Sequence, residues 1–219
     1  MVKVNYSPCI LGIKGYPQGV FLILPCFLGI EVCRRQGRKY QADRGSTGSQ
    51  RIRGTPHRQP GTTHEKARHY LWRFWTRLPK TGHIAIFDRT WYGRVMVERL
   101  EGFCSTNDWQ RAYNEINEFE KELSQWGAVI IKFWVQIDKD TQLERFTERQ
   151  NTPEKQWKIT DEDWRNRDKW DQYEDAVNEM LQKTSTEYAP WHILESVDKK
   201  YARIKALKIV IEELEKALG

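Results

Sequence analysis

Cysteine and histidine are scarce in this sequence, which argues against zinc-binding and disulfide-stapled classes of protein. The 219 residues include four cysteines and five histidines. No two cysteines have CxxC spacing, and the histidines form no zinc signature with them. We therefore expect reduced thiols, as is usual for cytoplasmic proteins, and no metal ion held by sulfur.

Long hydrophobic runs are also missing. The longest apolar stretch, residues 19–30, is interrupted by Pro25 and is well short of the roughly 20 residues that a membrane-spanning helix needs. It lacks the small-residue cleavage site of a secretory signal. The sequence therefore predicts a cytoplasmic protein with no membrane partner.

A glycine-rich phosphate loop is the third absence. Between Gly19 and Gly61 there is no GxxxxGK sequence, and the Gln-Gly-Arg-Lys of residues 36–39 lacks the neighbouring glycines of a tight phosphate-binding turn. Residues 31–61 consist largely of Arg, Gly, Gln, Ser and Thr. This composition is typical of a disordered or basic tail, or of a nucleic-acid-binding arm. We therefore separate an atypical basic segment, residues 1–61, from a domain at 62–219.

Positive charge is plentiful. The formal net charge is +6 and the isoelectric point is near 9.1, which favours a polyanionic partner: nucleic acid, an acidic membrane surface or a phosphate polymer. At this length the chain can form one α/β domain with a buried core.

The pattern of apolar residues alternates between strand and helix. Helices are predicted at 65–78, 107–126, 138–150 and 198–218, and strands at 84–87, 128–135 and 191–195. This alternation predicts a parallel sheet with helices on both faces. We expect Leu143 and Phe146 to point inward. On the closing helix we expect the buried side to consist of Ile204, Leu207, Val210, Ile211 and Leu214.

A candidate site follows the short apolar run at 84–87. Asp88 comes at its carboxyl end, where parallel sheets bind ligands, and Arg89 and Arg94 follow. An acid beside guanidinium groups suits a phosphate chain bridged by Mg²⁺. The alternative is that Asp88 pairs with Arg89 for structural reasons alone.

Residues 151–183 are rich in charged and aromatic side chains. Thr160 opens a TDED sequence with the character of a helix-capping box. A segment of this kind between core elements forms either a movable flap over a substrate or a solvated helical hairpin.

Several stretches together resemble the polyphosphate kinase 2 family. They include FDRTWYGRVMVERLEGF at 87–103, KFWVQIDKDTQLERFTERQ at 132–150 and TSTEYAPWHILESVDKKYARI at 184–204. The resemblance, from residue 62 to about 218, implies a three-layer, P-loop kinase-like α/β/α fold with a helical lid near 151–183. It also implies Mg²⁺-dependent phosphoryl transfer between inorganic polyphosphate and a nucleotide. WKITDEDWRNR at 157–167, followed by TST and APW, is most similar to members that phosphorylate AMP.

The resemblance also implies roles for individual residues. Asp88 matches the acid that holds Mg²⁺, and Arg89 is an adjoining catalytic phosphate contact. Phosphoryl transfer needs mainly positioning and positive charge around the phosphate oxygens, which these residue types supply. The residues expected to bind substrate are Arg94, Glu98, Arg145, Arg149, Lys155, Lys158, Lys199 and Arg203.

The amino-terminal segment departs from the family, whose members carry a Walker A loop of the form GxDxAGKGG. When residues 31–61 are written as degenerate codons and read one nucleotide later, the permitted sequences include SAAGKGGNIRRI and GYEVHPIASP, which both look like family sequence. We hypothesise that this segment is translated out of frame and that the frame is restored near Gly61. The alternative is a divergent basic amino terminus.

Three classes of function remain open. The first is the family's enzyme activity, with inorganic polyphosphate and AMP or ADP as partners and a homo-oligomeric state. The second is an inactive phosphate-binding relic, which the missing loop favours. The third is a basic nucleic-acid-binding protein, although no helix-turn-helix, RRM or zinc pattern is present and no specific nucleic acid is expected. An ATP-dependent nucleotide kinase is disfavoured because it also requires the absent loop.

Overall fold

The computed structural model describes residues 19–24, 52–56, 63–79, 81–88 and 90–218. Most of the atypical segment at 1–61, including the place where a Walker A loop was sought, lies outside these residues. Residues 52–56 within it form a strand that pairs with residues 84–88, so the expectation of a disordered tail is wrong for them. The elements are, in chain order, β1 (Gly19–Leu24), β2 (Ile52–Pro56), α1 (Thr63–Lys66), α2 (Trp72–Trp75), β3 (Ile84–Asp88), η2 (Trp91–Val95), α3 (Val97–Leu100), α4 (Thr106–Gln125), β4 (Ala128–Gln136), α5 (Lys139–Asn151), η3 (Pro153–Lys158), α6 (Asp161–Asp168), α7 (Trp170–Thr184), β5 (Trp191–Glu195) and α8 (Lys199–Leu218).

The strands form a five-stranded sheet in the order β2-β3-β1-β4-β5, and all four pairings are parallel. β1 lies at the centre, where Leu22 is paired with Ile86 of β3 and with Ile131 of β4. Central parallel strands are covered on both faces, which explains their continuous apolar sequences. The predicted strands at 84–87 and 128–135 are confirmed as parallel members of one sheet, and each pairs with β1.

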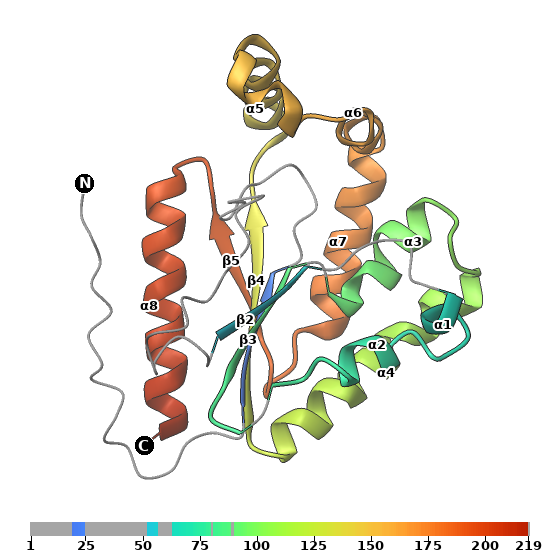
Figure 1. Ribbon diagram of the computed structural model, residues 1–219, viewed down its shortest axis with the longest axis vertical. Coiled ribbons are helices and arrows are strands. Elements are labelled where there is room, and N and C mark those ends of the chain that lie inside the picture. The colour runs from blue at the N-terminus through green and yellow to red at the C-terminus, as the bar shows by residue number, and fades with distance from the viewer. Residues whose placement is uncertain (1–18, 25–51, 57–62, 80, 89, 219) are drawn as a thin grey trace.

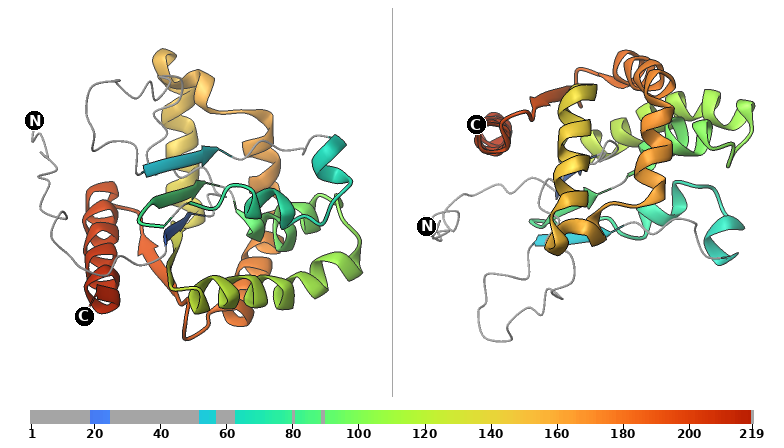
Figure 2. Two further views of the ribbon diagram at one scale, coloured as in Figure 1. Left: turned by 60° about the horizontal axis from the view of Figure 1, so that its bottom comes forward. Right: turned by 90° about the horizontal axis from the view of Figure 1, so that it is seen from above.

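Helices cover both faces of the sheet, as the alternation predicted. Figure 1 shows α8 on one side of the strands and α4 and α7 on the other, and Figure 2 shows the same separation from two further directions. The larger core lies on the α4 and α7 side, around Trp91, Phe87 and Phe119. The smaller core lies under α8 and includes Ile131, Phe133 and Val135.

The aromatic residues of the larger core meet edge to face. The Trp91 ring lies 5.4 Å from Phe74 and 4.9 Å from Phe119 between centroids, within the range that aromatic pairs favour. Trp91 and Phe119 come from η2 and α4, so these contacts join the loop after β3 to the main helical layer.

Helix α4 illustrates how local sequence sets element boundaries. Its capping box joins Ser105 and Asp108, with the Asp108 backbone N–H donating to the Ser105 hydroxyl at 3.2 Å. Gly127 ends it in a left-handed conformation, with φ of 95°, which glycine adopts at little cost. The helix predicted at 107–126 is confirmed, and its apolar stripe of Tyr113, Ile116, Phe119 and Leu123 is buried.

The prediction of one continuous helix at 65–78 is wrong. The chain instead forms α1 and α2, joined by a turn in which the Trp72 N–H donates to the His69 carbonyl at 2.9 Å. The turn brings the Tyr70 ring against the Arg94 guanidinium, with 4.5 Å from its central carbon to the ring centroid. This contact with a distant residue competes with the helical hydrogen-bond ladder, and local periodicity cannot reveal it.

Two predictions of side-chain direction also need correction. Leu143 was expected inward but is 40% exposed, whereas Phe146 is buried as predicted. On α8, Val210 and Leu214 pack against the smaller core. The expected burial of Ile204, Leu207 and Ile211 is wrong, because each is more than half exposed. The helix is apolar on more than one face, so hydrophobicity alone could not identify its packed side.

We predict that Ile131→Ala lowers the free energy of unfolding by about 2–5 kcal/mol, because Ile131 is fully buried in the middle of β4 and its loss leaves a cavity. Urea denaturation followed by circular dichroism measures the change. Leu143→Ala is the control, since that side chain is partly in water and should cost much less. Equal losses in the two variants would contradict this packing.

Candidate functional site

The carboxyl ends of the parallel strands meet at one edge of the sheet. Asp88 ends β3 and is paired with Leu24 of β1 and Pro56 of β2. The neighbouring strands end at Gln136 and Glu195, which are paired with each other. The backbone of Asp88 therefore lies where the sequence predicted. The described structure does not include its side chain, and Arg89 lies outside the described residues.

The loop after β3 is held by its own side chains. Thr90 caps η2, since its hydroxyl accepts from the Tyr92 backbone N–H at 3.3 Å. Trp91, Tyr92 and Val95 are buried. These buried anchors, rather than the strand alone, set the position of the residues that follow Asp88.

Arg94 and Glu98 form an ion pair within this loop region. The Arg94 Nε lies 3.1 Å from a carboxylate oxygen of Glu98, and the guanidinium stacks on the ring of Tyr70. Burial raises the pKa of Glu98, and the positive charge of Arg94 opposes that rise. The pair holds the guanidinium in a fixed orientation near the sheet edge.

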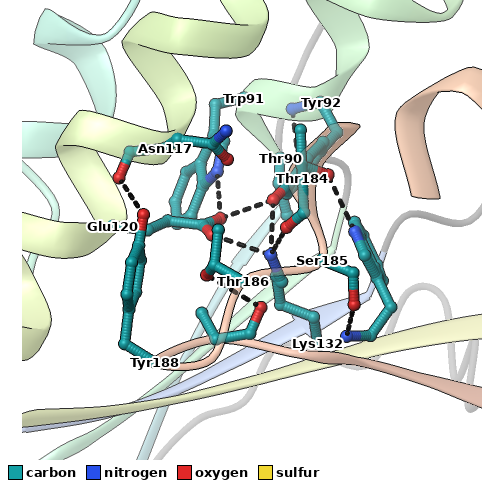
Figure 3. A network of polar contacts seen from close by, with 12 residues as sticks. Thr90, Trp91, Tyr92, Asn117, Glu120, Lys132, Thr184, Ser185, Thr186 and Tyr188 are labelled. Atoms are coloured by element: carbon teal, nitrogen blue, oxygen red, sulfur yellow. Dashed lines mark hydrogen bonds and ion pairs between the residues drawn. The ribbon is translucent and has the colours of Figure 1, made fainter. Parts of the chain in front are cut away.

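Beneath the loop lies a buried network centred on Lys132 of β4 and Glu120 of α4, neither of which has any exposed side-chain surface. The Lys132 ammonium donates to Glu120 Oε2 at 2.8 Å, to the Tyr92 hydroxyl at 2.9 Å and to the Thr184 carbonyl at 2.6 Å. An ammonium group has three N–H donors, and all three are used. Figure 3 shows these side chains converging between α4 and the sheet.

Glu120 joins the same network to the loop after β3. Its Oε1 accepts from Trp91 Nε1 at 2.9 Å and from the Tyr92 hydroxyl at 2.7 Å (Figure 3). Burial raises the pKa of Glu120 and lowers that of Lys132, while each partner's charge opposes the shift. Desolvation is therefore the larger influence on both groups.

Sequence reasoning missed this network, although a signal was present. Lys132 interrupts an otherwise apolar strand, and Glu120 lies on the apolar stripe of α4 between Phe119 and Leu123. Charged residues are almost never fully buried unless paired, so two opposite charges at core positions indicate a buried pair.

Helix α5 has an unusual buried face. After its Asp138 cap, the buried residues at helical spacing are Gln142, Arg145, Phe146 and Arg149, three of them polar. A helix that packs only on a core presents an apolar stripe. The inward guanidinium groups of α5, which follows β4 at the carboxyl edge, are the arrangement expected of an anion-binding face.

Arg145 ties α5 to the loop between β5 and α8. It donates to the backbone oxygens of Ser196 and, at 3.0 Å, Val197. These acceptors are neutral. Burial, followed by the positive charge of Arg149, lowers the pKa of Arg145. The charges of Asp138 and Glu148 oppose both effects, and an anion bound beside the two guanidinium groups would oppose them further.

The predicted lid region begins at the end of α5. Lys155 of η3 pairs with Glu148, and the side chain of Lys158 is not described. Helix α6 packs on α5, with the rings of Trp164 and Phe146 5.2 Å apart. Helix α7 instead enters the larger core through Val177 and Met180. A movable lid over residues 151–183 stays a prediction, and η3 and α6 are the part of it that contacts α5.

The remaining predicted residues, Lys199 and Arg203, lie in the first turns of α8 and are exposed. Because α8 follows β5, its amino-terminal end lies near the same sheet edge. By topology, Asp88 ends β3, α5 follows β4 and α8 follows β5, so each lies beyond the carboxyl end of a strand of the sheet. The described part of the chain contains no group of three or more His, Cys, Asp or Glu side chains arranged to hold a metal ion.

Among the described residues, no helix is both long enough and apolar enough to cross a bilayer. The fold defines the chain as an α/β protein with a five-stranded parallel sheet, and the helix that follows β4 carries two buried guanidinium groups.

The family can be stated more closely. Residues 49–218 match the family model described as polyphosphate kinase 2 (PPK2), and the chain therefore belongs to the polyphosphate kinase 2 family. The polyphosphate:AMP phosphotransferase of Pseudomonas aeruginosa is 58% identical over 156 residues, which cover 71% of this chain and 32% of that protein. The AMP/ADP-polyphosphate phosphotransferase of Meiothermus ruber is 39% identical over 154 residues, covering 70% of this chain and 58% of that protein.

Solved structures agree with this assignment. A crystal structure of polyphosphate kinase 2 from Pseudomonas aeruginosa has a TM-score of 0.80 and 45% sequence identity, covering 92% of this chain and 42% of that chain. The Arthrobacter aurescens structure has a TM-score of 0.79 and 32% identity, covering 92% of this chain and 70% of that chain. The matched part of this chain spans about a third of the length of the Pseudomonas aeruginosa phosphotransferase.

We predict that Glu120→Gln lowers the free energy of unfolding by about 3–5 kcal/mol, because it leaves the Lys132 ammonium buried without its carboxylate partner. The glutamine oxygen can still accept from Trp91 and Tyr92, but the amide N–H₂ that replaces Oε2 cannot accept from the Lys132 ammonium, so the loss includes that hydrogen bond as well as the charge. Urea denaturation measures it.

The control is the double variant Glu120→Gln with Lys132→Met, which removes both charges. It should recover more than half of the loss seen in Glu120→Gln, because no unpaired charge remains in the core. Losses that simply add in the double variant would show that the two residues are not coupled.

Proposed function

We propose that this chain transfers phosphoryl groups between inorganic polyphosphate and AMP at the carboxyl edge of its sheet. The observation that carries the proposal is the buried guanidinium face of α5, formed by Arg145 and Arg149, in a chain of the polyphosphate kinase 2 family. Relatives 58% and 57% identical are named for AMP, whereas relatives named for ADP or GDP alone are 35–39% identical. AMP is therefore the proposed acceptor.

Each candidate residue then has a physical role. Arg145 and Arg149 hold the polyphosphate chain, and Arg94, oriented by Glu98 and Tyr70, contacts the transferred or accepting phosphate. Lys155 and Lys158 add charge when the lid approaches, and Lys199 and Arg203 extend the basic surface along α8. In phosphoryl transfer the protein supplies mainly alignment and charge, so this set needs no nucleophilic side chain.

Mg²⁺ fits this site as a proposed cofactor. Mg²⁺ commonly binds through one or two carboxylates together with substrate phosphates, so a single acid at the end of β3 is sufficient. Asp88 is the proposed ligand because it ends a central strand at the proposed phosphate-binding edge. When bound, the ion would neutralise charge on the phosphate oxygens. Arg89, which directly follows Asp88 in sequence, is the proposed second catalytic residue.

We also propose that the chain has a P-loop kinase-like fold that lacks the phosphate-binding loop. A parallel sheet in the order β2-β3-β1-β4-β5 supports the fold, and the sequence after β1 contains no GxxxxGK. The backbone N–H groups of such a loop would align the transferring phosphate. We infer that the chain as written binds phosphate better than it turns it over. An inactive phosphate-binding relic is the second candidate, favoured by that same missing loop.

Polyphosphate binding tests the basic face. Arg149→Gln should weaken binding about tenfold or more at low salt, because it removes a buried, charge-assisted contact. Binding by the unchanged chain should weaken as salt rises. Lys121→Gln is the matched control, since it removes one positive charge from the exposed middle of α4. Fluorescence anisotropy with labelled polyphosphate measures both, and equal effects would show that only net charge matters.

Turnover tests the missing loop. A version with a frame-corrected amino terminus should form ADP from AMP and polyphosphate about 10²–10⁴-fold faster than the chain as written, because the loop restores alignment and electrostatic stabilisation. Asp88→Asn in the corrected version should abolish most of that gain. If the uncorrected chain is as fast as the corrected version and Asp88→Asn changes nothing, then the missing loop does not limit turnover and Asp88 does not hold the metal ion.

A further inference from the structure

Helix α3 is a single turn, and its two ends have different partners. Glu98, in the turn itself, pairs with Arg94. At the other end, Glu101 caps the helix and accepts from the Lys169 ammonium at 2.8 Å, and the Leu100 carbonyl lies 3.4 Å from the same nitrogen. One turn of helix is only about 5 Å long. The Arg94 guanidinium and the Lys169 ammonium are therefore linked through one short, hydrogen-bonded element.

Lys169 lies where the outer part of the predicted lid meets the body of the domain. It alone separates α6 from α7, and its backbone, with φ of −96° and ψ of 20°, interrupts the helical conformation. The two helices are therefore not one continuous rod. The side chains of Lys169 and Glu101 are 34% and 24% exposed, so their ion pair is partly shielded from water. Figure 1 shows α6 at one end of α7, with α3 beside α7.

Helix α6 is joined in turn to the buried face of α5. Arg167 donates to the side-chain oxygen of Gln142 at 3.0 Å, and the Trp164 ring meets the Phe146 ring edge to face at 5.2 Å. Gln142 and Phe146 belong to the face of α5 that the proposed function assigns to polyphosphate. A ligand that orders this face therefore also orders α6, which ends beside Lys169.

The middle of α3 is held by different contacts. Arg99 donates to Glu179 at 2.6 Å and to the Tyr113 hydroxyl at 3.2 Å, and its guanidinium stacks on the Trp109 ring at 3.9 Å. These partners belong to α4 and to the interior of α7, away from α6. The contact of α3 that depends on the position of α6 is therefore the one made by Lys169.

We propose that Lys169 is a positioning residue that couples the two substrates, so that inorganic polyphosphate and AMP each tighten the binding of the other. The coupling rests on the proposed function, in which polyphosphate binds α5 and the AMP phosphate contacts Arg94. Polyphosphate that orders α5 and α6 fixes Lys169 beside Glu101, so α3 needs less ordering when AMP binds. By linkage, the gain in affinity is the same for both ligands.

The first experiment measures AMP binding by calorimetry with and without inorganic polyphosphate, in EDTA so that no phosphoryl group is transferred. For the unchanged chain, saturating polyphosphate should tighten AMP binding about fivefold or more. Lys169→Glu and Glu101→Lys, made singly, should each reduce this gain to less than about twofold, because each replaces an attraction by a repulsion. The double exchange restores an ion pair and should recover the gain.

The matched control is Lys216→Glu. Lys216 lies 2.7 Å from Glu213 on α8, so the change reverses the same charge and breaks an exposed ion pair away from α3. It should leave the gain unchanged. Lys169→Gln removes the charge without adding a repulsion, and its gain should lie between those of the unchanged chain and Lys169→Glu. Circular dichroism should show every variant folded, since the side chains concerned are partly exposed.

Hydrogen exchange separates coupling from a purely structural role. The Leu100 and Glu101 amides donate to backbone carbonyls one turn earlier, at 2.9 and 2.8 Å. Polyphosphate should slow the exchange of both amides in the unchanged chain but not in Lys169→Glu. A purely structural Lys169 would alter their exchange in the free protein and leave the response to polyphosphate intact.

The proposal is overturned if both ligands bind but neither tightens the other, or if Lys169→Glu keeps the full gain. It is also overturned if the double exchange is no better than the single variants. A different result marks failure of the proposed function: if the unchanged chain fails to bind AMP or fails to bind polyphosphate, that function is wrong, and the coupling is wrong with it.

Discussion

The buried pair of Lys132 and Glu120 is the interaction on which the proposed site depends. It joins β4, α4, the end of α7 and the loop after β3 through hydrogen bonds that use every donor of the ammonium group. An apolar pair of the same volume could have been as stable, but it would have offered no hydrogen-bond partner to the side chains of Trp91 and Tyr92. The charges therefore serve to place the loop that follows Asp88.

Positive charge gathers on the buried face of α5. Arg145 and Arg149 are buried on α5, and the pKa of Arg145 is lowered by burial and by its neighbour. The charges of Asp138 and Glu148 oppose both effects, as a bound anion would. In phosphoryl transfer, alignment and charge supply most of the catalysis. In the proposed site the end of β3 would supply alignment, and the arginines of α5 would supply charge.

Local sequence patterns predicted much of the fold, but they predicted the candidate site only in outline. Strand, helix and cap signals predicted β3, α4 and β4 well, because these signals are contained within a few residues. The break at His69 and the exposure of Ile204 could not be predicted, since both depend on contacts made by distant parts of the chain. Lys132 and Glu120 were each visible as charges at apolar positions, but their pairing requires the sheet. The Arg89 and phosphate-loop predictions concern residues that the structure does not describe.

The most direct test of the account is a crystal structure grown with inorganic polyphosphate and Mg²⁺. We expect phosphate density along the buried face of α5, contacting Arg145 and Arg149, with a metal peak beside the carboxylate of Asp88. Polyphosphate bound only to the basic segment at 31–61 or to the outer side of α8, with the sheet edge holding solvent, would contradict the assignment of this edge as the phosphate-binding site.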